Sequence, residues 1–230
     1  MKNSTIMNYS NKSFEVIPIE NHLETIDKKG EIKKILEGLN SNVKMIHSKY
    51  FYDKSGSELF EKITQLPEYY PTRTEKSILK PLSKELFTNL KNTDIVELGS
   101  GDNSKISILL KTINQKYIHT IRYLPVDVSI DAIRKSQEDL IEKFPLLQTS
   151  GIACDFINHL HKIPNNRDRL FCFFGSTIGN LKKNEAISFL KQLSNQMKYG
   201  EKLLLGLDLD KDILTLEKAL ELALTNHPEL

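Results

Sequence analysis

One segment of this chain is best suited to hold a ligand. It is a short apolar stretch with an acid near its end, followed by a turn that contains two glycines. It is the run Asp94-Ile95-Val96-Glu97-Leu98-Gly99-Ser100-Gly101. Glycines between a strand and a helix let a nucleotide-like ligand approach bare backbone, because no Cβ blocks it. A dinucleotide-binding turn has the pattern G-x-G-x-x-G, with pyrophosphate at the helix N-terminus. Here Ser104 replaces the third glycine and Glu97 precedes the turn, which favours a cationic ligand without phosphates, such as the amino-acid end of S-adenosylmethionine.

Polar residues follow the next predicted strands in the same way. Asp127 lies at the end of the second strand, where a carboxylate accepts hydrogen bonds from both hydroxyls of an adenosyl ribose. Asp155 and Phe156 follow the third strand, where an acid suits the adenine amino group and an aromatic ring stacks on the base. After the fourth strand comes the loop Gly175-Ser176-Thr177-Ile178-Gly179-Asn180, in which Asn180 offers both a donor and an acceptor.

Each of these residues also has a structural explanation. Asp127 can cap the helix expected from residue 130, although Ser129 is nearer to its start. Asp155 can cap a short helix through His159, and Asn180 can cap the helix expected near residue 183. A glycine pair after a strand is common by itself. Four ligand-suited strand ends in the expected order rarely arise by chance, and together they indicate an adenosyl-binding site.

The elements before residue 93 differ from those after it. Residues 1–29 form a polar lead rich in Asn and Ser, and residues 30–92 are predicted to form a helical cap. Amphipathic helices are expected over 30–39, 57–66 and 73–90, from the spacing of their apolar residues. In the third of these, Thr72 and Glu75 form a candidate capping box, and Pro81 is expected to kink or break the helix.

Residues 93–230 alternate strands and helices. Strands are predicted at 95–98, 123–128, 149–154, 170–174 and 202–207, and helices at 104–114, 130–143, 183–198 and 211–222. Apolar strands that alternate with helices predict a mostly parallel sheet covered on both faces, a Rossmann-like α/β fold. In such a sheet, ligands bind at the carboxyl ends of the strands.

Composition limits the classes of partner. Of the 230 residues, 39% are hydrophobic and 27% are charged, which is typical of a globular protein. The 32 basic and 30 acidic side chains give a net charge of +2, so the chain lacks the excess of basic residues that is typical of nucleic-acid-binding proteins. Met1–Phe14 is polar, and no apolar run is long enough to cross a bilayer. We expect a small-molecule substrate, no nucleic-acid or membrane partner, and a monomer.

The remaining reactive side chains indicate neither a metal site nor a nucleophile. Cys154 and Cys172 fall inside apolar, strand-like runs, as expected of buried, reduced thiols in a cytoplasmic protein. The six histidines include no Cys/His cluster of ligand spacing, so no metal is expected. The glycine turn also lacks the G-x-S-x-G frame of a nucleophile elbow.

Two further segments resemble the histidine-specific S-adenosylmethionine methyltransferases. They are Phe51-Tyr52-Asp53 with Gly56-Ser57-Glu58-Leu59-Phe60, and Leu66-Pro67-Glu68-Tyr69-Tyr70-Pro71-Thr72-Arg73-Thr74-Glu75. The glycine turn, Pro125–Ser129, Gly175–Leu181 and Leu204–Asp208 continue the resemblance. This family includes the L-histidine Nα-methyltransferase of ergothioneine biosynthesis. The resemblance implies a class I methyltransferase fold and transfer of a methyl group to the α-amine of histidine or a related amino acid.

The resemblance also implies roles for individual residues. The implied S-adenosylmethionine contacts are Tyr52, Gly99, Ser100, Gly101, Lys105, Asp127, Asp155 and Phe156. Tyr69, Gly175 and Asn180 are implied to hold the amino-acid substrate. No residue is assigned as catalytic, because the sulfonium is already a good electrophile and alignment does most of the work.

The resemblance is lost near the end of the chain. Ala219-Leu220-Glu221-Leu222 stands where the family has a substrate-contacting tyrosine. Family members continue beyond this point with the lid that recognises the imidazole ring and with the last strands, so we expect a C-terminally truncated chain. Two other functions stay open: a cofactor-binding remnant without catalysis, and a methyltransferase of another small-molecule amine. An NAD-dependent reductase is opposed by Glu97 and by the missing third glycine.

Overall fold

A parallel sheet forms the centre of the molecule in the computed structural model, which describes residues 17–23, 27–51, 53–101 and 103–227. The sheet has seven strands in the order β1-β5-β3-β2-β6-β7, and β4 pairs with β3. The strands are β1 (Ile19–Asn21), β2 (Thr93–Leu98), β3 (Arg122–Asp127), β4 (Gln148–Thr149), β5 (Gly151–Ala153), β6 (Asp168–Phe173) and β7 (Lys202–Leu205). Every pairing among the described strands is parallel. The predicted α/β class with a mostly parallel sheet is therefore confirmed.

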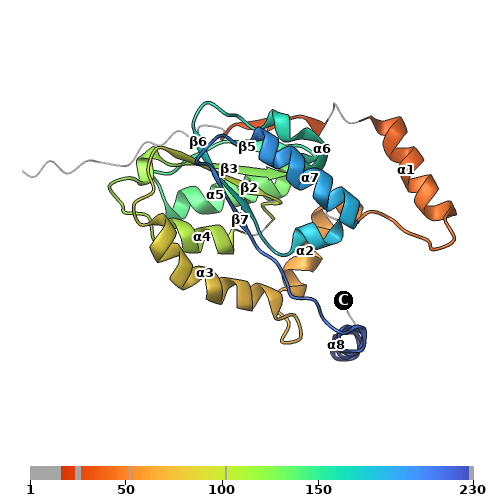
Figure 1. Ribbon diagram of the computed structural model, residues 1–230. Helices are drawn as coiled ribbons and strands as arrows, with labels where there is room; N and C mark the ends of the chain where they lie inside the picture. Colours follow the sequence, from red (N-terminus) through yellow and green to blue (C-terminus); the bar gives the residue numbers. More distant parts are fainter. Residues whose placement is uncertain (1–16, 24–26, 52, 102, 228–230) are drawn as a thin grey trace, which may run out of the picture.

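Helices cover both faces of this sheet (Figure 1). The helices of the described residues are α1 (Lys28–Asn40), α2 (Lys54–Ile63), α3 (Pro71–Phe87), α4 (Ser104–Leu110), α5 (Ile130–Lys143), α6 (Phe156–His159), α7 (Lys183–Gln196) and α8 (Ile213–Asn226). Short 3₁₀ turns occur at Ser48–Phe51, Ile118–Thr120, Leu160–Lys162 and Thr177–Asn180. Helices α3, α4 and α5 pack on one face, and α6 and α7 pack on the other.

The core divides into two clusters because successive side chains of a strand point to opposite faces. On one face, Ile95 of β2 packs with Leu79 of α3 and Ile106 of α4. On the other face, the next residue, Val96, packs in a cluster with Phe189 of α7. Coverage of both faces explains why the strands read as nearly continuous apolar runs in the sequence.

The start of α3 differs from the prediction. The helix begins at Pro71, directly after Tyr70, and no side chain caps it. Thr72 and Glu75 therefore do not form a capping box, and the Glu75 carboxylate instead binds the backbone of Gly175. Proline has no backbone N–H, so at the first helical position it leaves no donor that a cap would have to satisfy. This favours a helix that starts at Pro71, two residues before the predicted start.

Pro81 does not break α3, which continues to Phe87. An interior proline costs a helix about 3 kcal/mol or more, because it removes one hydrogen bond and crowds the preceding turn. Leu79 and Phe87 lie on either side of it and are 3% and 0% exposed. The packing of these two side chains in the core outweighs the local cost.

The predicted polar lead contains a strand that its sequence does not reveal. Ile19–Asn21 lies parallel to Gly151–Ala153, and the His22 N–H donates to the Ala153 carbonyl at 2.8 Å. A strand of three residues is too short to show alternation. Other bounds shift by a few residues: the predicted strand over 149–154 is divided into β4 and β5, and the helix from Ser104 ends at Leu110.

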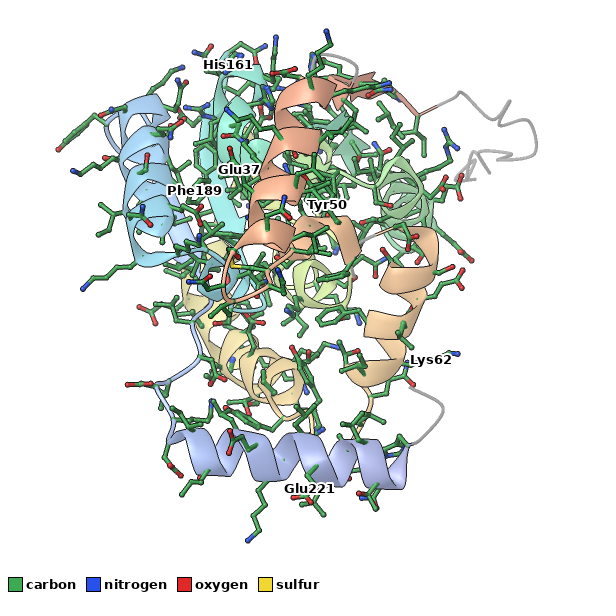
Figure 2. All side chains as sticks on the ribbon, turned by 90° about the vertical axis from the view of Figure 1, so that its right-hand side faces the viewer. Glu37, Tyr50, Lys62, His161, Phe189 and Glu221 are labelled. Atoms are coloured by element: carbon green, nitrogen blue, oxygen red, sulfur yellow. The ribbon has the colours of Figure 1, made fainter. Side chains whose placement is uncertain are left out.

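Helix α8 lies apart from the sheet. Figure 2 shows it, with Glu221, running across the bottom of the molecule as a separate layer. None of its residues is buried. Its C-terminal end is held by Asn226, whose Nδ2 donates to Oε1 of Glu68 at 2.9 Å. Within the described residues, no helix combines the length and the apolar character needed to cross a membrane.

Candidate functional site

The glycine turn joins β2 to α4 in the middle of the carboxyl edge of the sheet. Gly99 has a φ of +73°, a left-handed conformation that favours glycine, and its N–H donates to the Val126 carbonyl at 2.8 Å. Ser100 is fully buried, and its Oγ has no hydrogen-bond partner among the described residues. A Cβ on Gly101 would meet no described atom within 4 Å. The turn therefore offers open backbone to a ligand, as its sequence predicts.

Glu97, by contrast, lies in the interior. Its side chain is on the same face of the sheet as Tyr123, whose hydroxyl donates to Oε2 of Glu97 at 2.5 Å, and Glu97 is 2% exposed. Burial and this neighbouring carboxylate raise the pKa of Tyr123 well above its usual value. The acid that the sequence places just before the turn is thus held by the core.

Asp127 ends β3 beside the glycine turn. Its Oδ1 accepts the Ser129 N–H at 2.9 Å, and the N–H groups of Val128 and Ser100 also bind the carboxylate. Burial outweighs these hydrogen bonds and raises the pKa of Asp127 from 3.8 to about 6. The side chain that caps α5 is Ser129, whose Oγ accepts the Ala132 N–H at 3.2 Å. Capping of α5 therefore does not explain the half-buried acid at this position.

Asp155 follows β5 and is 5% exposed. It stands at the start of α6 but makes no side-chain hydrogen bond to the helix backbone. Its Oδ2 accepts a hydrogen bond from Nζ of Lys49 at 2.9 Å and one from Nδ2 of Asn158 at 3.0 Å.

Lys49 also forms an ion pair with Glu31 of α1 at 2.5 Å. Burial alone would raise the pKa of Glu31, but the bonds from Lys49 and its neighbours lower it to about 2. Lys49 therefore ties the predicted cap to the sheet.

Phe156 approaches the glycine turn from α6. Its ring packs edge-to-face against Phe173 and Phe189, with centroids 5.6 and 6.1 Å apart. Two of its ring carbons lie 3.9 Å from the place that a Cβ on Gly99 would occupy. The fold thus brings Gly99, Asp127 and Phe156 to one part of the sheet edge, as the sequence predicts.

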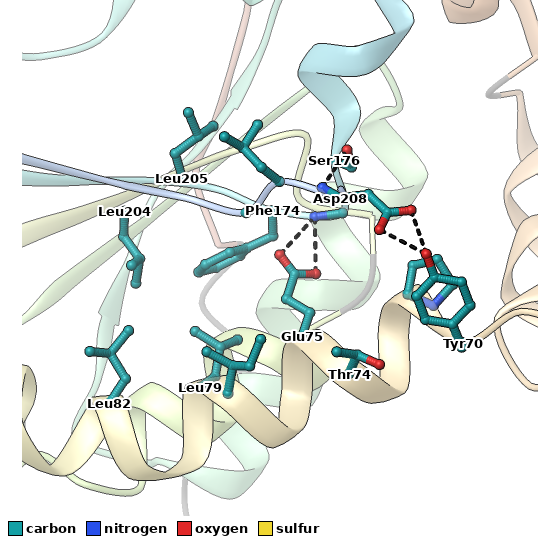
Figure 3. A pocket seen from close by; sticks show the side chains of 15 residues that line it. Tyr70, Thr74, Glu75, Leu79, Leu82, Phe174, Ser176, Leu204, Leu205 and Asp208 are labelled. Carbon is teal, nitrogen blue, oxygen red and sulfur yellow. Dashed lines mark hydrogen bonds between the residues drawn. The ribbon is translucent and has the colours of Figure 1, made fainter. Parts of the chain in front are cut away.

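The loop after β6 is bound to both α3 and α4. Gly175 has a φ of +74° and Ser176 a φ of +55°. The Gly175 N–H donates to both oxygens of Glu75, at 3.0 and 3.1 Å (Figure 3). Oε2 of Glu75 is also 2.7 Å from Nζ of Lys105. A Cβ on Gly175 would lie 3.2 Å from the same Nζ. Two predicted residues, Lys105 and Gly175, are therefore neighbours.

Three other predicted residues have different surroundings. Tyr69 is half-buried and packs edge-to-face on Phe60, with 6.0 Å between the centroids. Asn180 is exposed at the end of its 3₁₀ turn and does not cap α7, which begins after Lys182. Tyr52 lies outside the described residues.

A cavity of about 260 Å³ lies between α3 and the ends of β6 and β7. Leucines and Phe174 line most of it, and a polar rim is formed by Tyr70, Glu75, Ser176 and Asp208 (Figure 3). The Tyr70 hydroxyl donates to Asp208 at 2.8 Å, and the Asp208 N–H donates to Oγ of Ser176 at 3.1 Å. Among the predicted site residues, Gly175 lines this cavity.

Two residues of this rim, Glu75 and Asp208, are not among the site residues that the sequence predicts. Asp208 follows β7 just as Asp127 and Asp155 follow their strands, so the strand-end rule would have found it if applied to the fifth predicted strand. Glu75 carried no comparable signal, because its partner Gly175 is 100 residues away.

The cysteines and the paired histidines have surroundings of their own in the part of the chain that the structure describes. Burial raises the pKa of Cys154 to about 12 and that of Cys172 well above its usual value, so both free thiols stay protonated. His159 and His161 have ring centroids 5.9 Å apart. In the described part of the chain, no group of three or more His, Cys, Asp or Glu side chains is placed to hold a metal ion.

Comparison with known proteins identifies the family to which this chain is similar. The family model described as "Histidine-specific methyltransferase, SAM-dependent" matches residues 31–224. The histidine N-alpha-methyltransferase of Mycobacterium tuberculosis (strain CDC 1551 / Oshkosh) is 37% identical over 204 residues, which cover 88% of this chain and 63% of that protein. That of Mycolicibacterium smegmatis is 39% identical over 187 residues, which cover 81% and 58%. The 4-dimethylallyltryptophan N-methyltransferase of Aspergillus fumigatus is 24% identical over 168 residues, which cover 70% and 49%. The chain thus matches less than two thirds of the length of each of these relatives.

The substitution Asp127→Asn is expected to raise the free energy of unfolding at neutral pH by about 1–3 kcal/mol. The folded-state pKa of about 6 exceeds the ordinary 3.8. Between these values the unfolded chain has released the proton that the folded chain still holds, so the contribution of Asp127 to stability falls as pH rises from 4 to 6. Urea unfolding from pH 4 to pH 8 measures this.

The control is Asp131→Asn, on the exposed first turn of α5. It should leave the pH dependence of stability unchanged, apart from a small shift. A difference between wild type and Asp127→Asn that does not grow between pH 4 and 6 would contradict the assignment of a raised pKa to Asp127.

Proposed function

The chain belongs to the histidine-specific, S-adenosylmethionine-dependent methyltransferase family, and we propose that it methylates the α-amine of histidine or of a related amino acid. One observation carries the proposal beyond family membership. At the carboxyl edge of the sheet, the glycine turn at Gly99, the half-buried acid Asp127 and the ring of Phe156 lie together. Such an edge suits a ligand that joins an adenosyl group to a charged amino-acid end.

S-adenosylmethionine supplies an electrophilic methyl group on a sulfonium. In the proposed site, Asp127 accepts hydrogen bonds from the ribose hydroxyls, and Asp155 accepts one from the adenine amino group. Phe156 lies against the base. Gly99 and Gly101 leave backbone accessible, Ser100 between them is a proposed contact through its unpartnered Oγ, and Lys105 faces the amino-acid end. Tyr52, outside the described residues, is proposed as a further contact. The unpartnered Oγ of Ser100 and the open space at Gly101 support this fit.

The protein's main contribution in this proposal is alignment. Tyr69, Gly175 and Asn180 hold the amino-acid substrate so that its amine lone pair points along the axis of methyl transfer. Holding two reactants in register contributes roughly 7–11 kcal/mol to lowering a barrier. The amine must arrive unprotonated. Asn180 and Tyr69 orient it, and the proton leaves to water.

We also propose that residues 30–92 act as a cap over the adenosyl end of the site. Lys49 supports this role, because its ammonium pairs with both Glu31 of α1 and Asp155. The proposed state is a monomer in the cytoplasm. Two free, buried cysteines support a reducing compartment.

A second candidate substrate is another small-molecule amine with an aromatic group. The apolar lining of the cavity next to Gly175 supports this candidate, because Leu79, Phe174 and Leu204 would accept a ring. The relative from Aspergillus fumigatus, named for 4-dimethylallyltryptophan, adds to the support. A chain that binds cofactor without turnover is the third possibility, and Leu220 on the exposed helix α8 is consistent with it.

Turnover tests these candidates directly. The purified chain, incubated with S-adenosylmethionine and L-histidine, is expected to yield methylated histidine and S-adenosylhomocysteine, both measured by mass spectrometry. A panel of tryptophan derivatives and other amines runs in parallel. Preference for histidine supports the first proposal, and preference for an indole amine supports the second. Absence of turnover with every amine contradicts both.

Asn180→Ala is expected to weaken amino-acid binding by about tenfold, since a hydrogen bond to a charged group contributes roughly 1.5–3 kcal/mol. Its effect on cofactor binding should be small. Isothermal titration with each ligand measures the two affinities separately. Asn195→Ala, on an exposed part of α7, is the matched control. Equal losses for both ligands in Asn180→Ala would rule out the proposed role.

A further inference from the structure

We infer that Glu75 is a positioning residue that couples the cofactor side of the site to the amino-acid side. It does so by holding Lys105 and the Gly175 loop with one carboxylate. The inference rests on the proposed function and extends it. Glu75 belongs to α3, outside the strand ends that define the site, and none of the proposed roles above uses it.

The contacts of Glu75 are close and shielded from solvent. Both of its carboxylate oxygens accept the Gly175 N–H, at 3.0 and 3.1 Å. Oε2 is also 2.7 Å from Nζ of Lys105. The side chains of Glu75 and Lys105 are 15% and 12% exposed. Hydrogen bonds with an ionised partner are about twice as strong as neutral ones, so this arrangement fixes both neighbours.

The loop that Glu75 holds needs an external support. Gly175 and Ser176 are consecutive residues with positive φ, and the second has a side chain. A non-glycine residue keeps this conformation only where its surroundings enforce it. Oγ of Ser176 accepts the Asp208 N–H, which fixes one side of the loop, and Glu75 fixes the other. Asn180 lies at the end of the same loop, so the position of Glu75 determines where the amino-acid substrate is held.

A second glycine makes this contact possible. A Cβ on Gly206 would lie 1.9 Å from Oε1 of Glu75 and 3.3 Å from Cα of Phe174. The backbone at Gly206 has no positive φ that would itself require glycine. The missing side chain therefore leaves the space that the Glu75 carboxylate occupies when it binds Gly175.

Coupling follows from the shared carboxylate. Lys105 lies on the proposed cofactor side and Gly175 on the proposed amino-acid side, and both bind the same group. A cofactor that orders Lys105 also orders Glu75, and through it the loop that receives the amino acid. By linkage, the amino acid then strengthens cofactor binding by the same factor.

The test compares Glu75→Ala with Glu75→Gln, which keeps an acceptor oxygen for the Gly175 N–H but loses the charge beside Lys105. Histidine affinity is measured by calorimetry without and with saturating S-adenosylhomocysteine, and the ratio of the two affinities gives the coupling. Glu75→Ala is expected to weaken histidine binding by about tenfold at saturating S-adenosylhomocysteine and to abolish the coupling. Glu75→Gln is expected to keep the affinity without S-adenosylhomocysteine within about threefold of wild type, because it still accepts the Gly175 N–H, but to lose most of the coupling. Glu85→Gln, an exposed acid on the same helix, is the control and should change nothing. Gly206→Ala should reproduce the effect of Glu75→Ala.

A purely structural role would lower the melting temperature of Glu75→Ala and leave the histidine affinity of the folded protein unchanged, which would overturn the inference. Full wild-type coupling in Glu75→Gln would also overturn it, because the charge shared with Lys105 would then not carry the coupling. Where Glu75→Ala does not fold, Gly206→Ala takes its place in the comparison. Wild type that binds neither ligand overturns the proposed function together with this inference. Wild type that binds both, with Glu75→Ala and Gly206→Ala equal to it, overturns the inference alone.

Discussion

Parallel pairing of the strands is the constraint on which the site depends. Because all described pairings run in one direction, the chain leaves β2, β3, β5 and β6 at the same edge of the sheet. The loops at this edge carry residues with positive φ, open backbone or carboxylates that are buried or half-buried, and these include Gly99, Gly101, Asp127, Asp155 and Gly175. Helices α3 and α4, packed on one face, then bring Glu75 and Lys105 to the same edge.

The two acids of this edge are stabilised differently. Asp155 has a cation, Lys49, at 2.9 Å, and a side-chain amide beside it. Asp127 is bound by backbone N–H groups, and burial leaves its pKa raised to about 6. An acid with a raised pKa reduces the stability of the fold at neutral pH, and such groups are concentrated at functional sites. The position of Asp127 beside the glycine turn supports the proposed ligand site.

Local signals in the sequence were sufficient for much of the fold. Helix α5 matches its predicted bounds, Ile130–Lys143, because the Ser129 cap and the apolar spacing both act within a few residues. The predicted ends of two strands, at residues 128 and 154, lie one residue beyond the observed ends of β3 at Asp127 and β5 at Ala153. The ligand roles of Asp127 and Asp155 remain predictions. Features that depend on distant partners were not predictable: β1 exists because β5 offers it an edge, and Glu75 acts on a backbone 100 residues away.

Calorimetric titration of S-adenosylhomocysteine, with and without saturating L-histidine, tests the central claim most directly. The claim is that this edge binds an adenosyl cofactor and an amino acid together. It predicts cofactor binding that becomes tighter when histidine is present. Cofactor affinity that is indifferent to histidine would contradict the proposed substrate pocket, and absence of cofactor binding would contradict the site as a whole.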